Sequence, residues 1–377
     1  MFYMDAFNPK IKISTRVCLN DREDLATHYT PGIGEVVKAI ANDPEKASEY
    51  TLKRDSIAII SNGSAILGLG NLGPKPMLPV LEGKALILKR FGRVNPFPLA
   101  LKADKEELIK AAHMFAPTFA LIMVEDVKAP DSFEIQERLE KELEIPAFND
   151  DMYGTAVVTG AALLNALKLV KKENPKIVML GAGAAGLSVA RLLYDLGFKD
   201  VWIFDSKGVL TPERQDLNPQ KRKIAELFNK PPIEFKEALK GADVFLGFSK
   251  GNLLTAEDIK LMNKDAIIFA LANPVPEISK EEAFKAPNVA IYANGRSDCK
   301  NQINNSIAFP GIITGIVEAK AKRFTPKVLP DIARFIAQYH HPKKDNLLPD
   351  MFDRMFHSSL ADYVKNLCSN KCGGMVV

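Results

Sequence analysis

The segment 177–205 constrains the fold of this chain more than any other part of its sequence. Residues 177–180 are an apolar run, and the pattern G-x-G-x-x-G follows directly at 181–186. Residues 184–196 carry apolar side chains at helical spacing, Gly197 stands where a helix would end, and a second apolar run ends in Asp205. This order of strand, glycine turn, helix and strand with a terminal acid is typical of dinucleotide-binding units. It predicts a Rossmann-type, doubly wound parallel α/β domain that binds NAD or NADP.

The residues of this unit have separate predicted roles. Gly181 permits the tight turn, Gly183 lets the backbone approach a phosphate, and Gly186 allows the helix to pack closely on the strand. Asp205 can accept hydrogen bonds from the adenosine ribose and repels a 2′-phosphate, which favours NAD, but Lys207 could offset that repulsion, so NADP stays open. The predicted cofactor-binding set is Gly181, Gly183, Ala184, Ala185, Gly186, Asp205, Ser206, Lys207, Ser249 and Asn273.

A second G-x-G-x-x-G pattern occurs earlier, at residues 68–73. Pro74, Pro76 and Pro79 follow it directly. Prolines beyond a first helical turn disfavour a helix, so we expect no helix N-terminus facing a pyrophosphate here. The sequence therefore predicts only one dinucleotide site.

The rest of the chain alternates short apolar runs with helical patterns. Runs at 57–60, 65–67, 85–88 and 119–124 read as strands, and 104–115 and 131–143 read as helices, which predicts a parallel α/β layer. A long helical stretch at 155–171 precedes the dinucleotide unit. We expect an N-terminal catalytic and metal-binding domain at 1–155, the NAD(P) domain at 156–325, and C-terminal helices at 326–377 that can pack back on the first domain.

Composition excludes several classes of protein. The 377 residues carry a net charge of +4, spread along the chain, which gives no electrostatic footprint for nucleic acid or a membrane surface. Residues 1–12 lack the pattern of a signal peptide. The cysteines are too scattered for a disulfide framework or a zinc site; they are Cys18, Cys299, Cys368 and Cys372. A cytoplasmic enzyme is the expected class.

Two acidic pairs close apolar runs in the first half of the chain. Glu125-Asp126 follow one run and Asp150-Asp151 follow another. If the pairs converge, an all-oxygen ligand set suits Mg²⁺ or Mn²⁺ better than Zn²⁺; alternatively, they are solvated turn acids. Lys84 precedes an apolar stretch, and a divalent cation beside it would lower its pKa and make it a base. On sequence alone, a surface role for Lys84 stays open.

Several strings in this order resemble the malic enzymes, in particular their short bacterial-type branch. The similarity covers roughly residues 20–320. The matching strings are Tyr29-Thr30-Pro31-Gly32, Ile66-Leu67-Gly68-Leu69-Gly70-Asn71, Leu81-Glu82-Gly83-Lys84-Ala85, Glu125-Asp126, Phe148-Asn149-Asp150-Asp151, Gly154-Thr155-Ala156, the Gly181 motif, Ala270-Leu271-Ala272-Asn273-Pro274, Asn294-Gly295-Arg296-Ser297-Asp298, and Asn301-Gln302-Ile303-Asn304-Asn305 leading into Phe309-Pro310-Gly311.

The resemblance implies oxidative decarboxylation of L-malate to pyruvate and CO₂ with NAD(P)⁺ and Mg²⁺ or Mn²⁺, in a homodimer. It implies that Lys84 takes the C2 hydroxyl proton and that Tyr29 protonates C3 of the enolpyruvate. Asp150 would tune Lys84 or relay its proton. The implied metal ligands are Glu125, Asp126 and Asp151, and the implied substrate ligands are Asn273 and Asn304.

Some features leave alternatives open. Ala65 stands where larger animal relatives use an arginine, so the grip on the malate carboxylates is undetermined. A malolactic-type enzyme, which retains the cofactor and releases lactate, is the nearest rival. An amino-acid dehydrogenase is disfavoured by the acidic set, which that chemistry does not need. A catalytically dead NAD(P)-binding regulator is disfavoured by the presence of Tyr29, Lys84 and Asp151.

Overall fold

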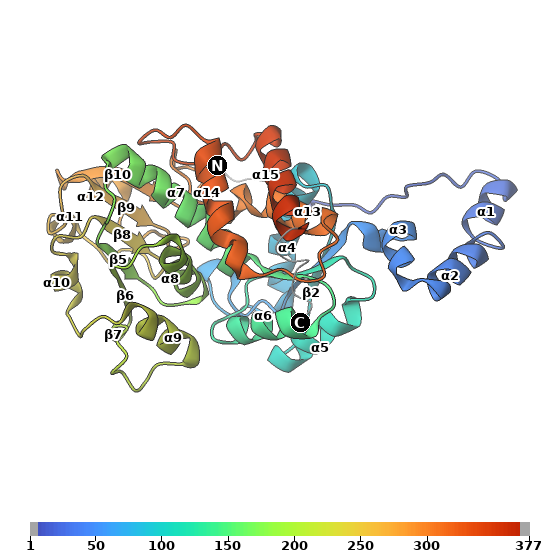
Figure 1. Cartoon of the computed structure of the whole chain (residues 1–377), viewed down its shortest axis with the longest axis horizontal. Coiled ribbons are helices and arrows are strands. Elements are labelled where there is room, and N and C mark those ends of the chain that lie inside the picture. The colour runs from blue at the N-terminus through green and yellow to red at the C-terminus, as the bar shows by residue number, and fades with distance from the viewer. Residues whose placement is uncertain (1–6, 370–377) are drawn as a thin grey trace.

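A computed structural model describes residues 7–369 and contains two separate sheets (Figure 1). The first sheet has the order β2-β1-β3-β4, and all its strands are parallel. Its strands are β1 (Ser56–Ser61), β2 (Asn95–Ala100), β3 (Leu121–Val124) and β4 (Ala147–Asn149). β1 and β3 are buried along their whole length, as central strands of a parallel sheet should be.

The second sheet has the order β10-β9-β8-β5-β6-β7, which is doubly wound around β5. Its strands are β5 (Ile177–Leu180), β6 (Val201–Asp205), β7 (Gly208–Val209), β8 (Val244–Gly247), β9 (Ala266–Ala270) and β10 (Val289–Asn294). All pairs are parallel except the short hairpin of β6 with β7. The carboxyl ends of β8 and β9 therefore meet at one edge, where α/β sheets bind ligands.

Helices connect and cover the strands. Around the first sheet lie α4 (Pro74–Phe91), α5 (Lys105–Phe115) and α6 (Asp131–Glu142). Along the second sheet lie α7 (Thr155–Val170), α8 (Ala184–Leu196), α9 (Pro219–Phe228), α10 (Phe235–Leu239), α11 (Ala256–Ile259) and α12 (Lys280–Ala283). The apolar stretch Asp150–Val170 is long enough to cross a membrane, but 72% of its most apolar window is buried inside the protein, as in a core helix.

The C-terminal helices join the two halves of the molecule. They are α13 (Phe309–Glu318), α14 (Leu329–Tyr339) and α15 (Arg354–Leu367). The Arg93 side chain, just after α4, donates to Glu318 on α13 at 2.5 Å and to Ser358 on α15 at 3.0 Å. α14 packs along α7. Cys372, one of the four scattered cysteines, lies outside the described residues.

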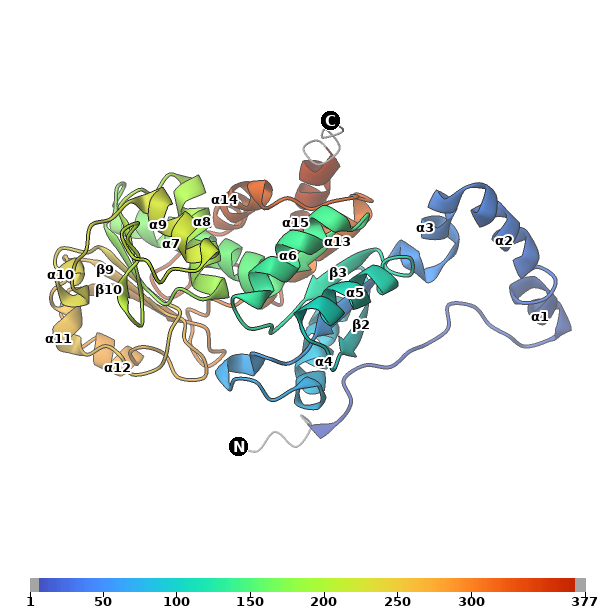
Figure 2. The same ribbon diagram turned by 90° about the horizontal axis from the view of Figure 1, so that it is seen from below.

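The N-terminal segment forms an arm that extends away from the body (Figures 1 and 2). It carries α1 (Arg22–His28), α2 (Ile33–Asn42) and α3 (Ala47–Tyr50). None of these three helices has a buried residue. Apolar side chains on the arm, including Leu25 and Val37, are exposed.

The α/β fold class is confirmed, and so are most expected elements, but three local predictions are wrong. Residues 85–88 are helical, within α4, because the chain stays helical from Pro74 onward. The prolines do not prevent this helix: Pro74 occupies its first turn, where backbone N–H groups need no partner, and only Pro79 lies inside. Residues 66–68 form a short 3₁₀ turn rather than a strand.

Candidate active site

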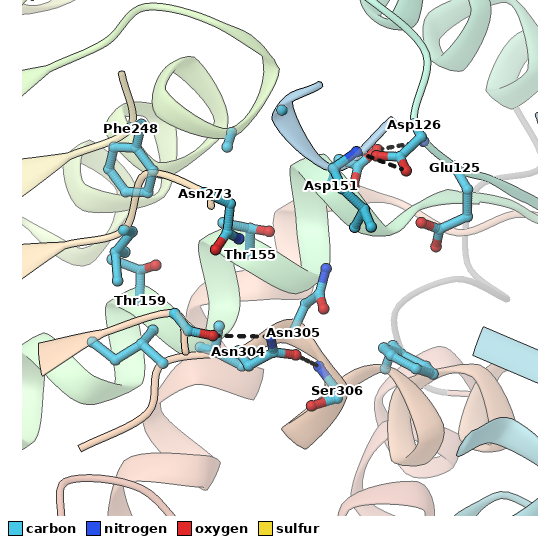
Figure 3. A pocket seen from close by; sticks show the side chains of 18 of the residues that line it. Glu125, Asp126, Asp151, Thr155, Thr159, Phe248, Asn273, Asn304, Asn305 and Ser306 are labelled. Atoms are coloured by element: carbon cyan, nitrogen blue, oxygen red, sulfur yellow. Dashed lines mark hydrogen bonds between the residues drawn. The ribbon is translucent and has the colours of Figure 1, made fainter. Parts of the chain in front are cut away.

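One pocket lies between the two sheets and brings together eight of the predicted site residues (Figure 3). Its volume is about 390 Å³. Acidic residues gather at one end, and the loops after β8 and β9 lie at the other (Figure 3). Of the predicted residues, those that line it are Lys84, Glu125, Asp126, Asp151, Ala185, Ser249, Asn273 and Asn304. Glu125 and Asp150, one from each acidic pair, are buried, so these two are not solvated turn acids.

Lys84 is the basic centre of the acidic end. α4 carries it into the pocket, where its ammonium contacts the Asp150 carboxylate and lies 3.3 Å from Glu125 Oε2. Burial alone would lower the pKa of Lys84, but the charges of Asp150, Glu125 and Asp151 together outweigh burial and raise it. These protein groups by themselves hold the amine protonated. A divalent cation among the same acids would act in the opposite direction.

The Asp126 and Asp151 side chains lie side by side (Figure 3). The backbone N–H of Asp126 donates to Asp151 Oδ2 at 2.8 Å, and the Leu67 N–H donates to Asp126 Oδ2 at 3.4 Å. Asp126 has a positive φ of 48°, a strained backbone of the kind that clusters at functional sites. Burial and the neighbouring charge of Asp151 raise the pKa of Asp126 to about 7.

The acidic end fits a divalent cation chemically. Burial raises the pKa values of Glu125, Asp150 and Asp151, in the case of Asp150 to about 6. Glu125 lines the pocket, and its Oε1 is buried without a hydrogen-bond partner, so its lone pairs are free to accept a ligand. Within residues 7–369, however, no three such side chains already stand as a closed metal-ligand cluster. A cation therefore needs small side-chain adjustments to bind all three predicted ligands.

The glycine turn has the geometry that its predicted roles require. Gly181 has a φ of +116°, and a Cβ there would clash with the Phe248 backbone. A Cβ on Gly186 would clash with the Gly181 carbonyl, because α8 begins so close to β5. Around Gly183 there is open space, so a ligand can approach its backbone. The turn is thus shaped for a phosphate at the N-terminus of α8.

Asp205 at the end of β6 is held by basic side chains. Arg214 donates to both of its carboxylate oxygens, at 2.9 and 3.2 Å, and Lys221 donates to Oδ2 at 2.6 Å. The ammonium of Lys207 instead pairs with Asp216 at 3.0 Å, and only its backbone N–H donates to Asp205. The side chains that offset the charge of Asp205 are thus Arg214 and Lys221, which the sequence analysis missed.

Four further pocket residues escaped the sequence analysis as site residues. Thr155 and Thr159 follow the second acidic pair on α7 and face the pocket (Figure 3). Asn305 adjoins the predicted Asn304. The Phe309 ring lies 4.8 Å from the Lys84 ammonium, which places an aromatic face against the cation. The sequence did carry a signal for Asn305 and Phe309, because the whole stretch 301–309 resembles the corresponding stretch of malic enzymes.

Tyr29 is not brought to the pocket by its own chain. It caps the C-terminus of α1 on the arm, and 66% of it is exposed. Asp205, Ser206 and Lys207 also lie outside the pocket lining, at the end of β6. Ala65 is not part of the lining either.

Comparison with known proteins identifies the family. Residues 152–360 match the family model for the malic enzyme NAD-binding domain, and residues 8–106 match the model for the malic enzyme N-terminal domain. The chain belongs to the malic enzyme family. The resemblance inferred from the motifs is thereby confirmed, and the first model covers more than half of the chain.

Relatives and solved structures of malic enzymes agree with this assignment. The chain is 43% identical to an NAD-dependent malic enzyme of Geobacillus stearothermophilus over 87% of this chain and 69% of that protein. It is 39% identical to a bifunctional malic/malolactic enzyme of Bacillus subtilis over 94% and 88%, respectively. The crystal structure of an NAD-dependent malic enzyme from Thermotoga maritima superposes with a TM-score of 0.91 at 43% identity, covering 94% of this chain and 96% of that one.

Proposed function

We propose that this chain oxidises L-malate with NAD(P)⁺ and decarboxylates the product to pyruvate and CO₂, with Mg²⁺ or Mn²⁺ bound in the pocket. One observation carries the proposal. A partly buried lysine among carboxylates and the open edge of a dinucleotide-binding sheet face the same cavity of about 390 Å³. When bound, the nicotinamide supplies the hydride acceptor and the cation supplies a Lewis acid for the C2 oxygen.

Lys84 is proposed as the base of the oxidation. Its nitrogen takes the proton of the C2 hydroxyl while the hydrogen on C2 leaves as hydride. The bond between C3 and the adjacent carboxylate then breaks, CO₂ departs, and Lys84 returns its proton to the C2 oxygen. Asp150 contacts the amine and can tune it or relay its proton. Glu125, Asp126 and Asp151 are proposed to hold the cation.

The amides of Asn273 and Asn304 are proposed to bind the substrate. Both line the pocket. Asn304 is oriented by its own hydrogen bonds, since its Oδ1 accepts from the Ser306 N–H at 2.9 Å and its Nδ2 donates to the Gly295 carbonyl at 3.4 Å. Amides can donate to a carboxylate or hydroxyl without carrying charge. Together with Lys84, these amides would bind the malate carboxylates, for which larger animal relatives use an arginine at the position of Ala65.

We further propose a cytoplasmic homodimer in which Tyr29 of one copy protonates C3 in the pocket of the other while Lys84 takes back the proton of the C2 hydroxyl. The arm supports this proposal, because α1 and α2 bury none of their residues against their own chain and expose apolar side chains. A second copy of the chain could cover these side chains. It would also bring the Tyr29 phenol to the pocket of the other copy.

The proposed reaction is tested by incubating the purified protein with L-malate, Mn²⁺ and either NAD⁺ or NADP⁺. We expect reduced nicotinamide and pyruvate to appear in equal amounts, to stop on addition of EDTA, and to resume when Mn²⁺ is restored. Lactate without net cofactor reduction would favour the malolactic alternative, which is raised by the name of the Bacillus subtilis relative. If no product forms under any of these conditions, the proposed reaction is wrong, and nucleotide binding is the only function that the fold still supports.

A further inference from the structure

A buried carboxylate outside the proposed chemistry links two loops of the pocket. Glu277, in the segment between β9 and α12, is fully buried. Its Oε1 accepts from the Ser249 N–H at 2.8 Å, just after β8, and its Oε2 accepts from the Ala272 N–H at 3.1 Å, just after β9. Ser249 and Ala272 both line the pocket. One side chain therefore ties together the ends of two neighbouring strands.

The main chain of Glu277 extends this connection. Its carbonyl accepts from the N–H groups of Leu253 at 2.8 Å and Leu254 at 3.0 Å. The loop that follows β8 is thus bound to Glu277 at its beginning and at its end. This loop carries Phe248, which lies in the pocket wall near Asn273 (Figure 3).

The last residue of β8 leaves room for the Glu277 carboxylate because it is a glycine. Gly247 ends β8, and a Cβ built on it would come within 2.5 Å of both carboxylate oxygens of Glu277. The carboxylate thus occupies the space that a side chain at position 247 would need. Any side chain there must displace it.

Both side-chain oxygens of Glu277 must act as hydrogen-bond acceptors. Both partners are backbone N–H groups, and an ionised carboxylate offers only acceptors. Burial raises the pKa of Glu277, and backbone N–H groups, among them those of Ser249 and Ala272, oppose that rise. A glutamine would fit the space but would turn an NH₂ group toward one of the two N–H donors.

We propose that Glu277 is a positioning residue that holds the loops 248–249 and 271–273 in the arrangement that binds the nicotinamide nucleotide. This inference rests on the proposed function, because it requires the cofactor to bind in this pocket. Glu277 acts through the loop backbones and touches neither the substrate nor the cofactor. The hydrogen bonds of its carboxylate go to the backbone of Ser249 and Ala272, and not to Lys84 or Asp151 at the acidic end.

The test compares Glu277→Gln with Glu282→Gln. Glu282 is a matched control, because its Oε1 accepts from the Ala256 N–H at 3.1 Å in the same part of the chain, away from the pocket. NADH and NADPH binding is measured by fluorescence titration of the full-length protein. Decarboxylation of oxaloacetate with Mn²⁺ and no nucleotide reports on the acidic end separately, since this step needs no hydride transfer.

For Glu277→Gln we expect the dissociation constant of the reduced nucleotide to rise about tenfold, from one unsatisfied buried donor. At saturating oxaloacetate, where weaker substrate binding by Asn273 no longer matters, the kcat of decarboxylation should stay within about twofold of the unmodified protein. The control variant Glu282→Gln should leave both the dissociation constant and this kcat within about twofold. Gly247→Ala should reproduce the Glu277→Gln result, because it displaces the carboxylate without removing it. If Glu277→Gln fails to fold, Gly247→Ala provides the test in its place.

Two results would overturn the inference. One is unchanged nucleotide binding in a folded Glu277→Gln or Gly247→Ala protein. The other is an equal loss of nucleotide binding and oxaloacetate decarboxylation, which indicates a general structural role. If the unmodified protein itself binds neither NADH nor NADPH, the proposed function fails instead, and the two failures are thereby distinguished.

Discussion

The Lys84 ammonium lies 3.3 Å from Glu125 Oε2, on the wall that faces the carboxyl edge of the second sheet. The two residues come from different elements, α4 and the end of β3, so the fold of the first sheet sets their separation. In the proposed reaction, this relationship would bring the proposed base and a proposed metal ligand to the same substrate atom. It is the reason that we assign the chemistry to this end of the pocket.

Replacement of the lysine tests that assignment. Lys84→Ala should lower the kcat of malate oxidation at least about a hundredfold, the usual contribution of a general base. Its affinity for NADH should stay within about threefold, because Lys84 lies opposite the dinucleotide turn. Lys75→Ala, an exposed lysine on the same helix, is the control and should retain full activity. Substantial turnover in Lys84→Ala would remove this residue from the mechanism.

The ion pairs of Asp205 make a prediction about cofactor choice. In Asp205→Ala, Lys221 loses its carboxylate partner, and Arg214 loses one of two while it keeps Asp216, so both cations can approach a 2′-phosphate more closely. We expect the ratio of kcat/KM for NADP⁺ over NAD⁺ to rise about tenfold, comparable with one charged hydrogen bond. Asp200→Ala, just before the opposite end of β6, should leave the ratio unchanged. An unchanged ratio in Asp205→Ala would show that another residue reads the ribose.

The position of Tyr29 predicts complementation between two inactive variants. Tyr29→Phe and Lys84→Ala should each lose nearly all malate turnover. If the arm serves the partner's pocket, a mixed dimer of the two variants holds one site in which both residues are intact. Dissociated and reassociated together, they should recover about a quarter of the normal activity, because half of the dimers are mixed and each has one working site of two. A mixture that stays inactive would assign Tyr29 to its own chain.

Close packing of α13 against α15 predicts a stability difference between two glycines. A Cβ on Gly315 would lie 2.5 Å from the Ala361 carbonyl oxygen and 2.7 Å from Val364 Cβ, so Gly315→Ala should lower the free energy of unfolding by about 1–3 kcal/mol. Gly83 lies in α4 with open space around it. Gly83→Ala should raise the free energy of unfolding by about 0.5–1 kcal/mol. Thermal unfolding of both variants, compared with the unmodified protein, measures the difference.

The sequence predicted those parts of the fold that depend on interactions between residues close together in the chain, such as turns, apolar spacing and helix caps. The helix 184–196 and its end at Gly197, which has a φ of +107°, were predicted because the glycine turn, the apolar spacing and the cap all agree. The opposite holds for α4. Its prolines suggested a loop, but a proline in the first turn is compatible with a helix, and packing of Leu81 and Leu88 in the core outweighs the cost of Pro79.

The site was predictable where adjacent residues form a motif and was missed where partners are distant in sequence. Glu125, Asp126 and Asp151 follow strands of one parallel sheet, so their convergence could be expected. Arg214 reaches Asp205 from a loop nine residues later, and no motif marks it. Nor does the sequence show that the arm carries Tyr29 away from the body, since this depends on tertiary packing.

The central claim is that the pocket removes a hydride from C2 of malate and passes it to a nicotinamide that then leaves the enzyme. It is tested most directly with L-malate deuterated at C2, followed by NMR of all products. We predict one deuterium in each molecule of released NADH or NADPH, and pyruvate that carries none. Deuterium retained at C2 of lactate, or a nicotinamide without label, would contradict this account.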